Sequence, residues 1–157
     1  MAKMGSADFS ELKKLQENLN KLAGSEEART AFCEACAKEL AARLLRAVIK
    51  RTPVGVYPAG SGRVGGTLRR GWSAGSDNMQ QALNNLRVTK SGGLYTIEIT
   101  NPVEYASYVE YGHRTSNHAK WVPGKFMMTI SENEIRRIAP QLLEKRLTEF
   151  LKGAFDA

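Results

Sequence analysis

The sequence predicts an α+β fold in which N- and C-terminal helices pack on a small antiparallel β-sheet, with long exposed loops. Three patterns support this fold class. Apolar residues recur every three or four positions at both ends, apolar and polar residues alternate over residues 94–100, and residues 53–66 contain five glycines and two prolines. The chain of 157 residues fits a single domain, residues 1–157.

Residues 8–51 are expected to be helical, in two segments. Gly24 suits the end of the first helix, whose apolar stripe is Phe9, Leu12, Leu15, Leu19 and Leu22. Ser25 is predicted to cap the second helix, and Pro53 to end it, because the residue before a proline avoids helical backbone angles. The predicted buried side of this helix is Phe32, Cys36, Leu40, Leu44 and either Val48 or Ile49.

Residues 53–66 are expected to form a mobile loop without helix or strand. The loop is about three times the common length, which is typical of functional or disordered segments. A partner that orders such a loop offsets the entropy lost on ordering. We therefore expect this loop, and a second loop at residues 113–124, to be disordered in the free protein and ordered on assembly.

Residues 67–100 are expected to be a β region. Strands are predicted at 67–74, 86–89 and 94–100, with a turn at 91–93, while residues 77–85 are either a short helix or a loose connection. A short helix at 103–111 and the loop at 113–124 follow, with an edge strand possible within 121–128. The final helix is expected at 130–152, with Ser131 and Glu134 at capping-box spacing and Pro140 kinking or splitting it. Its predicted apolar side is Ile135, Ile138, Leu142, Phe150 and Leu151.

Positive charge is concentrated in the middle of the chain. The formal net charge is +7, and residues 50–90 hold one acid, Asp77, against seven basic residues: Lys50, Arg51, Arg63, Arg69, Arg70, Arg87 and Lys90. Such a charge balance favours acidic partners such as nucleic acid, membranes or acidic proteins, and it does not choose among them. Arg63, Arg69 and Arg70 can contact phosphates, bind carboxylates of a protein partner, or stay solvated. If residues 67–74 form a strand, one of the adjacent arginines must be exposed.

No catalytic, cofactor or metal site is predicted. Cys33 and Cys36 lie on one helix without a second cysteine pair, which favours buried thiols over zinc or redox chemistry. His113, Asn117 and His118 suggest an HNH-type metal nuclease only weakly, because they share one polar loop without an acidic ligand. Neither a Ser–His–Asp set nor a phosphate-binding loop can be assembled.

Three tyrosines, Tyr105, Tyr108 and Tyr111, are spaced three apart on the short helix expected at 103–111. They either pack on the sheet or form an oligomer contact, since tyrosine is enriched at interfaces. Residues 1–10 lack a secretory signal, and no run is long enough to span a bilayer. The protein is therefore expected to be made in the cytoplasm, with no membrane partner.

Three motifs resemble a siphophage tail-component family. They are T-P-V-G from Thr52, G-G-T-L-R-R-G-W from Gly65, and N-P-V-E-Y-A-S-Y-V-E-Y-G-H-R from Asn101. The family pattern is TP-x-G, TG-x-LR and YA-x-x-VE-x-G, followed by an aromatic and proline-containing stretch, filled here by Trp121, Pro123, Phe126 and Met127. The resemblance covers about residues 40–150, and the insert at residues 56–64 departs from the pattern.

The resemblance implies a structural, non-enzymatic protein of the head–tail neck or tail end, acting in tail completion or head–tail joining. It implies a virion location, a ring in the assembled particle, other phage neck and tail proteins as partners, and no cofactor. The candidate interface residues are Arg63, Arg69, Arg70, Tyr105, Tyr108, Tyr111 and Trp121. A basic nucleic-acid-binding module and an HNH-type nuclease are the alternatives that we consider.

Overall fold

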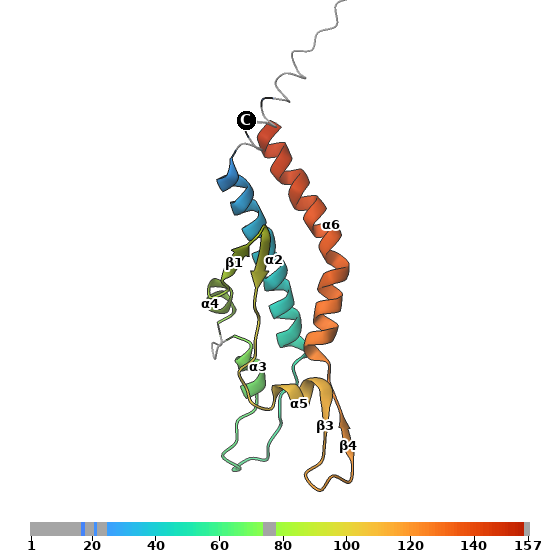
Figure 1. Ribbon diagram of the computed structural model, residues 1–157. Coiled ribbons are helices and arrows are strands. Elements are labelled where there is room, and N and C mark those ends of the chain that lie inside the picture. Colours follow the sequence, from blue (N-terminus) through green and yellow to red (C-terminus); the bar gives the residue numbers. More distant parts are fainter. Residues whose placement is uncertain (1–16, 18–20, 22–24, 74–77, 156–157) are drawn as a thin grey trace, which may run out of the picture. The chain divides into compact units, whose positions relative to one another are not determined.

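The fold is α+β, as predicted. The computed structural model describes residues 17, 21, 25–73 and 78–155, in which helices flank two small antiparallel hairpins (Figure 1). The chain divides into two compact units: Met1–Cys36 with Gln141–Ala157, and Ala37–Pro140. The first is called the terminal unit here and the second the central unit. None of the described helices is long and apolar enough to cross a bilayer.

Helix α2, Glu26–Arg51, begins and ends where the sequence predicts. The Ser25 hydroxyl accepts a hydrogen bond from the Ala28 amide at 3.1 Å, which satisfies an amide that lacks a partner within the helix. Of the predicted buried side, Cys36 and Val48 are buried, whereas Phe32, Leu40 and Leu44 are only half-buried. Ala41 and Leu45 are buried in addition. The apolar stripe of the helix expected before Gly24 lies outside the described residues.

Helix α6, Met127–Phe155, starts earlier than predicted, and the proposed capping box is wrong. Ser131 lies inside the helix, where its hydroxyl donates to the Met127 carbonyl at 2.6 Å. Pro140 does not split α6, because the helix continues on both sides of this proline. The boundary between the two units lies directly after Pro140. In the terminal unit, Phe150 of α6 stacks on Phe32 of α2 with centroids 4.5 Å apart.

The strand predicted at 67–74 is wrong, because its described part is a short helix. Helix α3, Thr67–Gly71, follows Gly66 in the left-handed region and buries Leu68. A five-residue segment is too short for its periodicity to separate helix from strand, so tertiary packing decides its conformation. Helix α4, Met79–Asn84, resolves the open alternative for 77–85, and the Asn78 side chain caps it.

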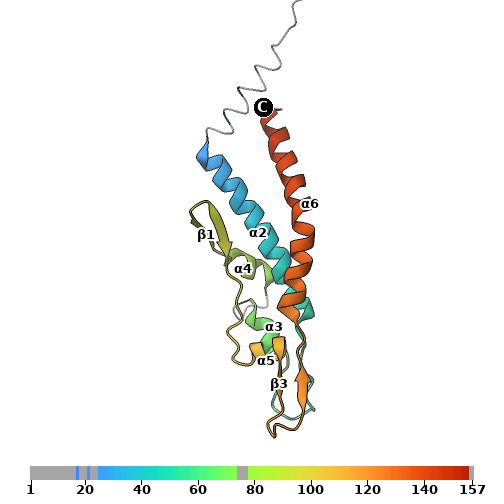
Figure 2. The same ribbon diagram turned by 45° about the vertical axis from the view of Figure 1, so that its right-hand side comes forward.

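Two separate hairpins replace the single predicted sheet. Strands β1, Val88–Ser91, and β2, Leu94–Ile97, pair antiparallel with Val88 opposite Ile97, and Gly92 and Gly93 form the turn with positive φ. Strands β3, Gly112–Arg114, and β4, Trp121–Pro123, also pair, so the loop predicted at 113–124 is partly wrong (Figure 2). The observed strand β4 is shorter than the strand expected within 121–128, because Met127 already belongs to α6.

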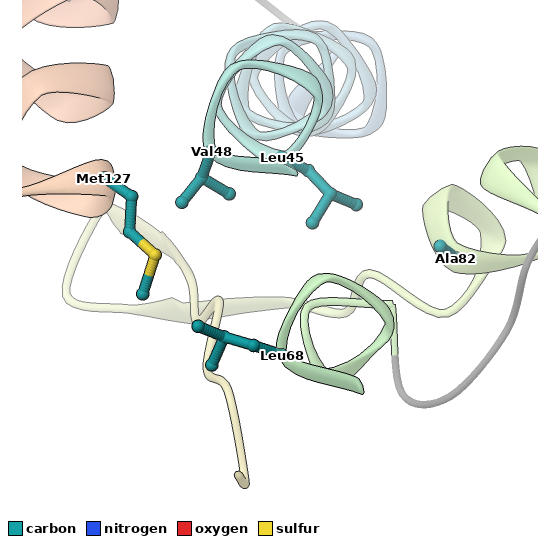
Figure 3. Packing of buried hydrophobic residues seen from close by; sticks show 5 residues of the cluster. All are labelled: Leu45, Val48, Leu68, Ala82 and Met127. Atoms are coloured by element: carbon teal, nitrogen blue, oxygen red, sulfur yellow. The ribbon is translucent and has the colours of Figure 1, made fainter. Parts of the chain in front are cut away.

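Helix α5, Ala106–Tyr111, confirms most of the short helix predicted at 103–111, and Gly112 follows it with a φ of 88°. The core of the central unit forms where α2, α3, α4 and α6 meet (Figure 3). Its buried residues are Leu45, Val48, Leu68, Ala82 and Met127. Fully burying a side chain the size of Leu, Val or Met stabilises a fold by about 1.5–3 kcal/mol. This core fixes the elements from which the exposed segments extend.

Candidate interaction surface

Two segments of the central unit extend from the same end of it, as Figures 1 and 2 both show. One is the connection at residues 53–66, which has neither helix nor strand, as predicted; the other is the β3–β4 hairpin. Val56 and Val64 of the connection are 94% and 77% exposed. Apolar side chains with so much exposed area bury little of it against the rest of the chain and contribute little to its stability. They are therefore available for a partner.

The connection at 53–66 is closed at its base by two glycines. A Cβ atom added to Gly65 would lie 2.0 Å from the Gly55 carbonyl oxygen, so the two arms pass at a distance that only glycine permits. Between them, the Arg63 guanidinium lies 6.0 Å from the centre of the Tyr57 ring. Residues 53–66 thus form a loop whose two ends lie close together and whose tip carries exposed side chains. We call this loop the excursion.

Thr52 anchors the start of this excursion and is fully buried. Its hydroxyl donates to the Val48 carbonyl at 2.7 Å and accepts from the Trp72 indole N–H at 2.8 Å. Its carbonyl oxygen accepts from Nε and Nη2 of Arg69, at 3.3 and 2.8 Å. Arg69 therefore holds the chain in place at the end of α2. This structural role could not be predicted from the sequence around Arg69.

The end of the excursion is bonded to α3, and α3 is bonded to the segment before α5. Arg70 donates from Nη1 to the Gly65 carbonyl at 3.4 Å. The Asn101 amide donates to the Leu68 carbonyl at 2.8 Å, and its oxygen accepts from the Val103 amide at 3.1 Å. Since α3 is a helix, the argument that one of the adjacent arginines must be exposed fails: both are half-buried.

Glu110 connects α5 to the start of α6 and is only 6% exposed. Its carboxylate accepts hydrogen bonds from the Met128 amide and from the amide and hydroxyl of Thr129, all at 2.7–2.9 Å. These amides belong to the first turn of α6, where a negative charge also interacts favourably with the helix dipole. Glu110 is thus the cap that the sequence wrongly assigned to Ser131, and local spacing gives no signal for it.

The two tyrosines of α5 and Tyr105 just before it are exposed to solvent, which contradicts the alternative that they pack on a sheet. Tyr105, Tyr108 and Tyr111 are 44%, 58% and 64% exposed, while Ala106 and Val109 turn toward the core. Large aromatic side chains on the adjoining hairpin and the start of α6 are also exposed. These five exposed side chains are called the aromatic surface here: Tyr105, Tyr108, Tyr111, Trp121 and Phe126.

The hairpin is held close to this surface by its glycines. A Cβ atom on Gly112 would lie 2.6 Å from the Val122 carbonyl oxygen, and one on Gly124 would lie 2.3 Å from that of Glu110. The Lys125 amide also donates to the Val109 carbonyl at 2.7 Å. Tyr105 in turn lines a cavity of about 290 Å³ with Tyr57 and Val64 of the excursion. Both extended segments therefore adjoin α5.

A family model described as "Bacteriophage HK97-gp10, putative tail-component" matches residues 13–112 of this chain. The match covers more than half of the 157 residues. The chain belongs to this family. No curated protein and no solved structure shows significant similarity to this chain.

The first two motifs lie within the match, and so does the third as far as Gly112, whereas the aromatic stretch at 121–127 follows it. In this HK97-gp10-like chain, motif residues make the contacts described above. Thr52 bonds to Arg69 and Trp72, Asn101 bonds to Leu68, and Glu110 caps α6. These residues thus hold the frame from which the excursion, the hairpin and the aromatic surface extend.

The histidines and cysteines of this tail component do not cluster in the part of the chain that the structure describes. Within it, no group of three or more His, Cys, Asp or Glu residues is placed to hold a metal ion. Nδ1 of His113 lies 3.4 Å from the Tyr108 carbonyl, and the Asn117 oxygen accepts from Thr115 and Ala119 within the hairpin turn. Cys36 is buried, as expected, whereas Cys33 is only half-buried.

Proposed function

We propose that this protein is a structural, non-enzymatic component of the phage neck or tail end, where copies form a ring that completes the tail or joins it to the head. Family membership supports a structural role in the tail. The observation that carries the finer proposal is the aromatic surface, with five large exposed side chains on a hydrogen-bonded frame. The protein is assembled in the host cytoplasm and remains in the virion.

Exposed tyrosine and tryptophan side chains suit a protein interface. They bury a large area at low cost in side-chain entropy and are enriched among residues that dominate binding energy. Here α5 is tied through Glu110 to α6 and through Asn101 to α3, so the surface is preorganised. The partners are other neck and tail proteins, together with a second copy of this chain.

A ring requires a heterologous contact, in which one surface of a subunit meets a different surface of the next. The excursion at 53–66 and the hairpin adjoin the aromatic surface, and together they supply one side of such a contact. Residues 53–66 and 111–126 contain no Asp or Glu but include Arg63, Arg114, Lys120 and Lys125. This charge favours an acidic surface on the adjoining protein. We propose that both segments become more ordered on assembly.

Deleting the gene in the parent phage or prophage and imaging the lysate by electron microscopy tests the proposal. We expect full heads separate from tails, or tails of abnormal length, with infectivity restored by the gene supplied in trans. Normal infectious particles would overturn the assembly role and leave a nucleic-acid-binding function, tested through the salt dependence of DNA affinity, as the next hypothesis.

A further inference from the structure

A cavity of about 340 Å³ in the central unit combines apolar walls with two arginines. Ile49, Val54 and Met79 supply apolar atoms, and Gly65 and Gly66 supply backbone. Arg69 and Arg70 are the charged residues of the lining, and no acidic residue is among its described members. The cavity lies beside the base of the excursion at 53–66, because Val54, Gly65 and Gly66 belong to that excursion.

Both guanidinium groups retain hydrogen-bonding capacity in this cavity. Arg69 uses Nε and Nη2 for the Thr52 carbonyl, and Arg70 uses Nη1 for the Gly65 carbonyl. A guanidinium has five N–H donors, and Nη1 of Arg69 and Nε and Nη2 of Arg70 donate no hydrogen bond to any residue that the structure describes. Carbonyl oxygens carry no net charge, so these bonds leave two adjacent positive charges without a counter-ion among the described residues.

We propose that this cavity binds the carboxylate of an Asp or Glu side chain from an adjoining subunit of the tail assembly. Both arginines are half-buried and line the cavity, so a carboxylate there would offset their charge through charge-assisted, bidentate hydrogen bonds. The apolar walls fit the methylene stem of an acidic side chain, whereas a phosphate group has no apolar part to place there. The identity of the partner rests on the proposed function; the carboxylate chemistry of the cavity does not.

Binding to the full-length protein can be measured by NMR with the dipeptide mimic N-acetyl-glutamate amide as the probe. We expect saturable shifts in the amides of Gly65 and Gly66 and in the Nε–H signals of Arg69 and Arg70. N-acetyl-glutamine amide, which has the same shape without the charge, should give none. Inorganic phosphate at equal ionic strength should bind more weakly than the glutamate mimic.

Arg70→Gln is the informative variant, because the Arg70 side chain makes only one long hydrogen bond to a described residue. It should weaken binding of the mimic about tenfold or more, the loss expected for a charge-assisted hydrogen bond. Arg63→Gln removes the same charge from the exposed excursion and should leave the affinity unchanged. If Arg70→Gln fails to fold, Arg70→Lys replaces it, since it keeps the charge and removes the planar fork.

Three outcomes would overturn the proposal: no saturable shifts, phosphate binding as tightly as the glutamate mimic, or equal losses in the Arg63 and Arg70 variants. A fourth concerns Asp77, the nearest acid in sequence, which lies outside the described residues. If Asp77→Asn tightens binding tenfold or more, the cavity serves this chain's own carboxylate and no partner. Because these measurements use the isolated protein, their failure would leave the gene-deletion phenotype, and so the assembly role, intact.

Discussion

Gly71 sits at the end of α3 where the chain before α5 passes closest to it. A Cβ atom at this position would lie 2.2 Å from Oδ1 of Asn101 and 2.8 Å from Cγ2 of Val103. The Asn101 oxygen cannot easily withdraw, because it accepts from the Val103 amide while the Asn101 nitrogen donates to Leu68. At the residue scale, the requirement for glycine thus comes from space and not from backbone angles.

Gly71→Ala should therefore destabilise the protein by about 1–3 kcal/mol, the cost of overpacking a well-packed site. Urea unfolding followed by circular dichroism measures this change. Gly153→Ala, inside α6 with nothing within 4 Å, is the matched control and should be neutral or stabilising by up to about 1 kcal/mol. Equal effects of the two substitutions would contradict the close contact at Gly71.

Helix α6 depends on a residue 17 positions before it begins, since Glu110 caps the first turn that opens at Met127. The backbone adds two bonds between the same regions: the Lys125 amide donates to Val109 and the Phe126 amide to Glu110. Arg51 at the end of α2 contacts Ser131 and Glu134 on the next turns of α6. At the element scale, α5, α2 and the start of α6 are therefore coupled in the central unit.

Glu110→Ala should lower the free energy of unfolding by about 1–3 kcal/mol, because it leaves partly buried amides of α6 without acceptors. Glu110→Gln should cost less, since its amide oxygen still accepts but the charge is lost. Glu104→Ala, an exposed acid just before α5, is the control and should change stability by less than about 0.5 kcal/mol. A Glu110→Ala protein as stable as the control variant would disprove the capping role.

The central unit separates residues that maintain the fold from residues available to a partner. Thr52, Leu68 and Met127 are buried within it, whereas the aromatic surface is built from side chains 42–64% exposed. A substitution on this surface should therefore affect assembly without affecting stability. This distinction lets the proposed interface be tested in the particle.

The double variant Tyr108→Ser and Tyr111→Ser should lower the yield of infectious phage at least tenfold in a complementation assay while leaving the melting temperature nearly unchanged. Loss of two central aromatic contacts is expected to cost several kcal/mol of binding. Leu94→Ser is the control, because Leu94 is 68% exposed on the other hairpin and should leave the yield intact. Full titres for the tyrosine variant would exclude this surface from the interface.

The sequence by itself determined the elements whose signals are local. Helix α2 has a capping serine, a continuous apolar side and a terminating proline, and all three are visible within about thirty residues. The alternation over 94–100 also holds: Tyr95, Ile97 and Ile99 are half-buried, and Thr96, Glu98 and Thr100 are exposed. The motifs led to the family that the comparison shows.

Tertiary structure decided what depends on residues far apart in sequence. Residues 67–71 become a helix because Leu68 enters the core and the Asn101 side chain donates a hydrogen bond to the Leu68 carbonyl. The start of α6 is set by Glu110, and the tyrosines of α5 turn outward because Ala106 and Val109 occupy the inward face. The periodicity of a short segment does not determine its conformation or which of its residues face the core. Long-range packing and hydrogen bonds determine both.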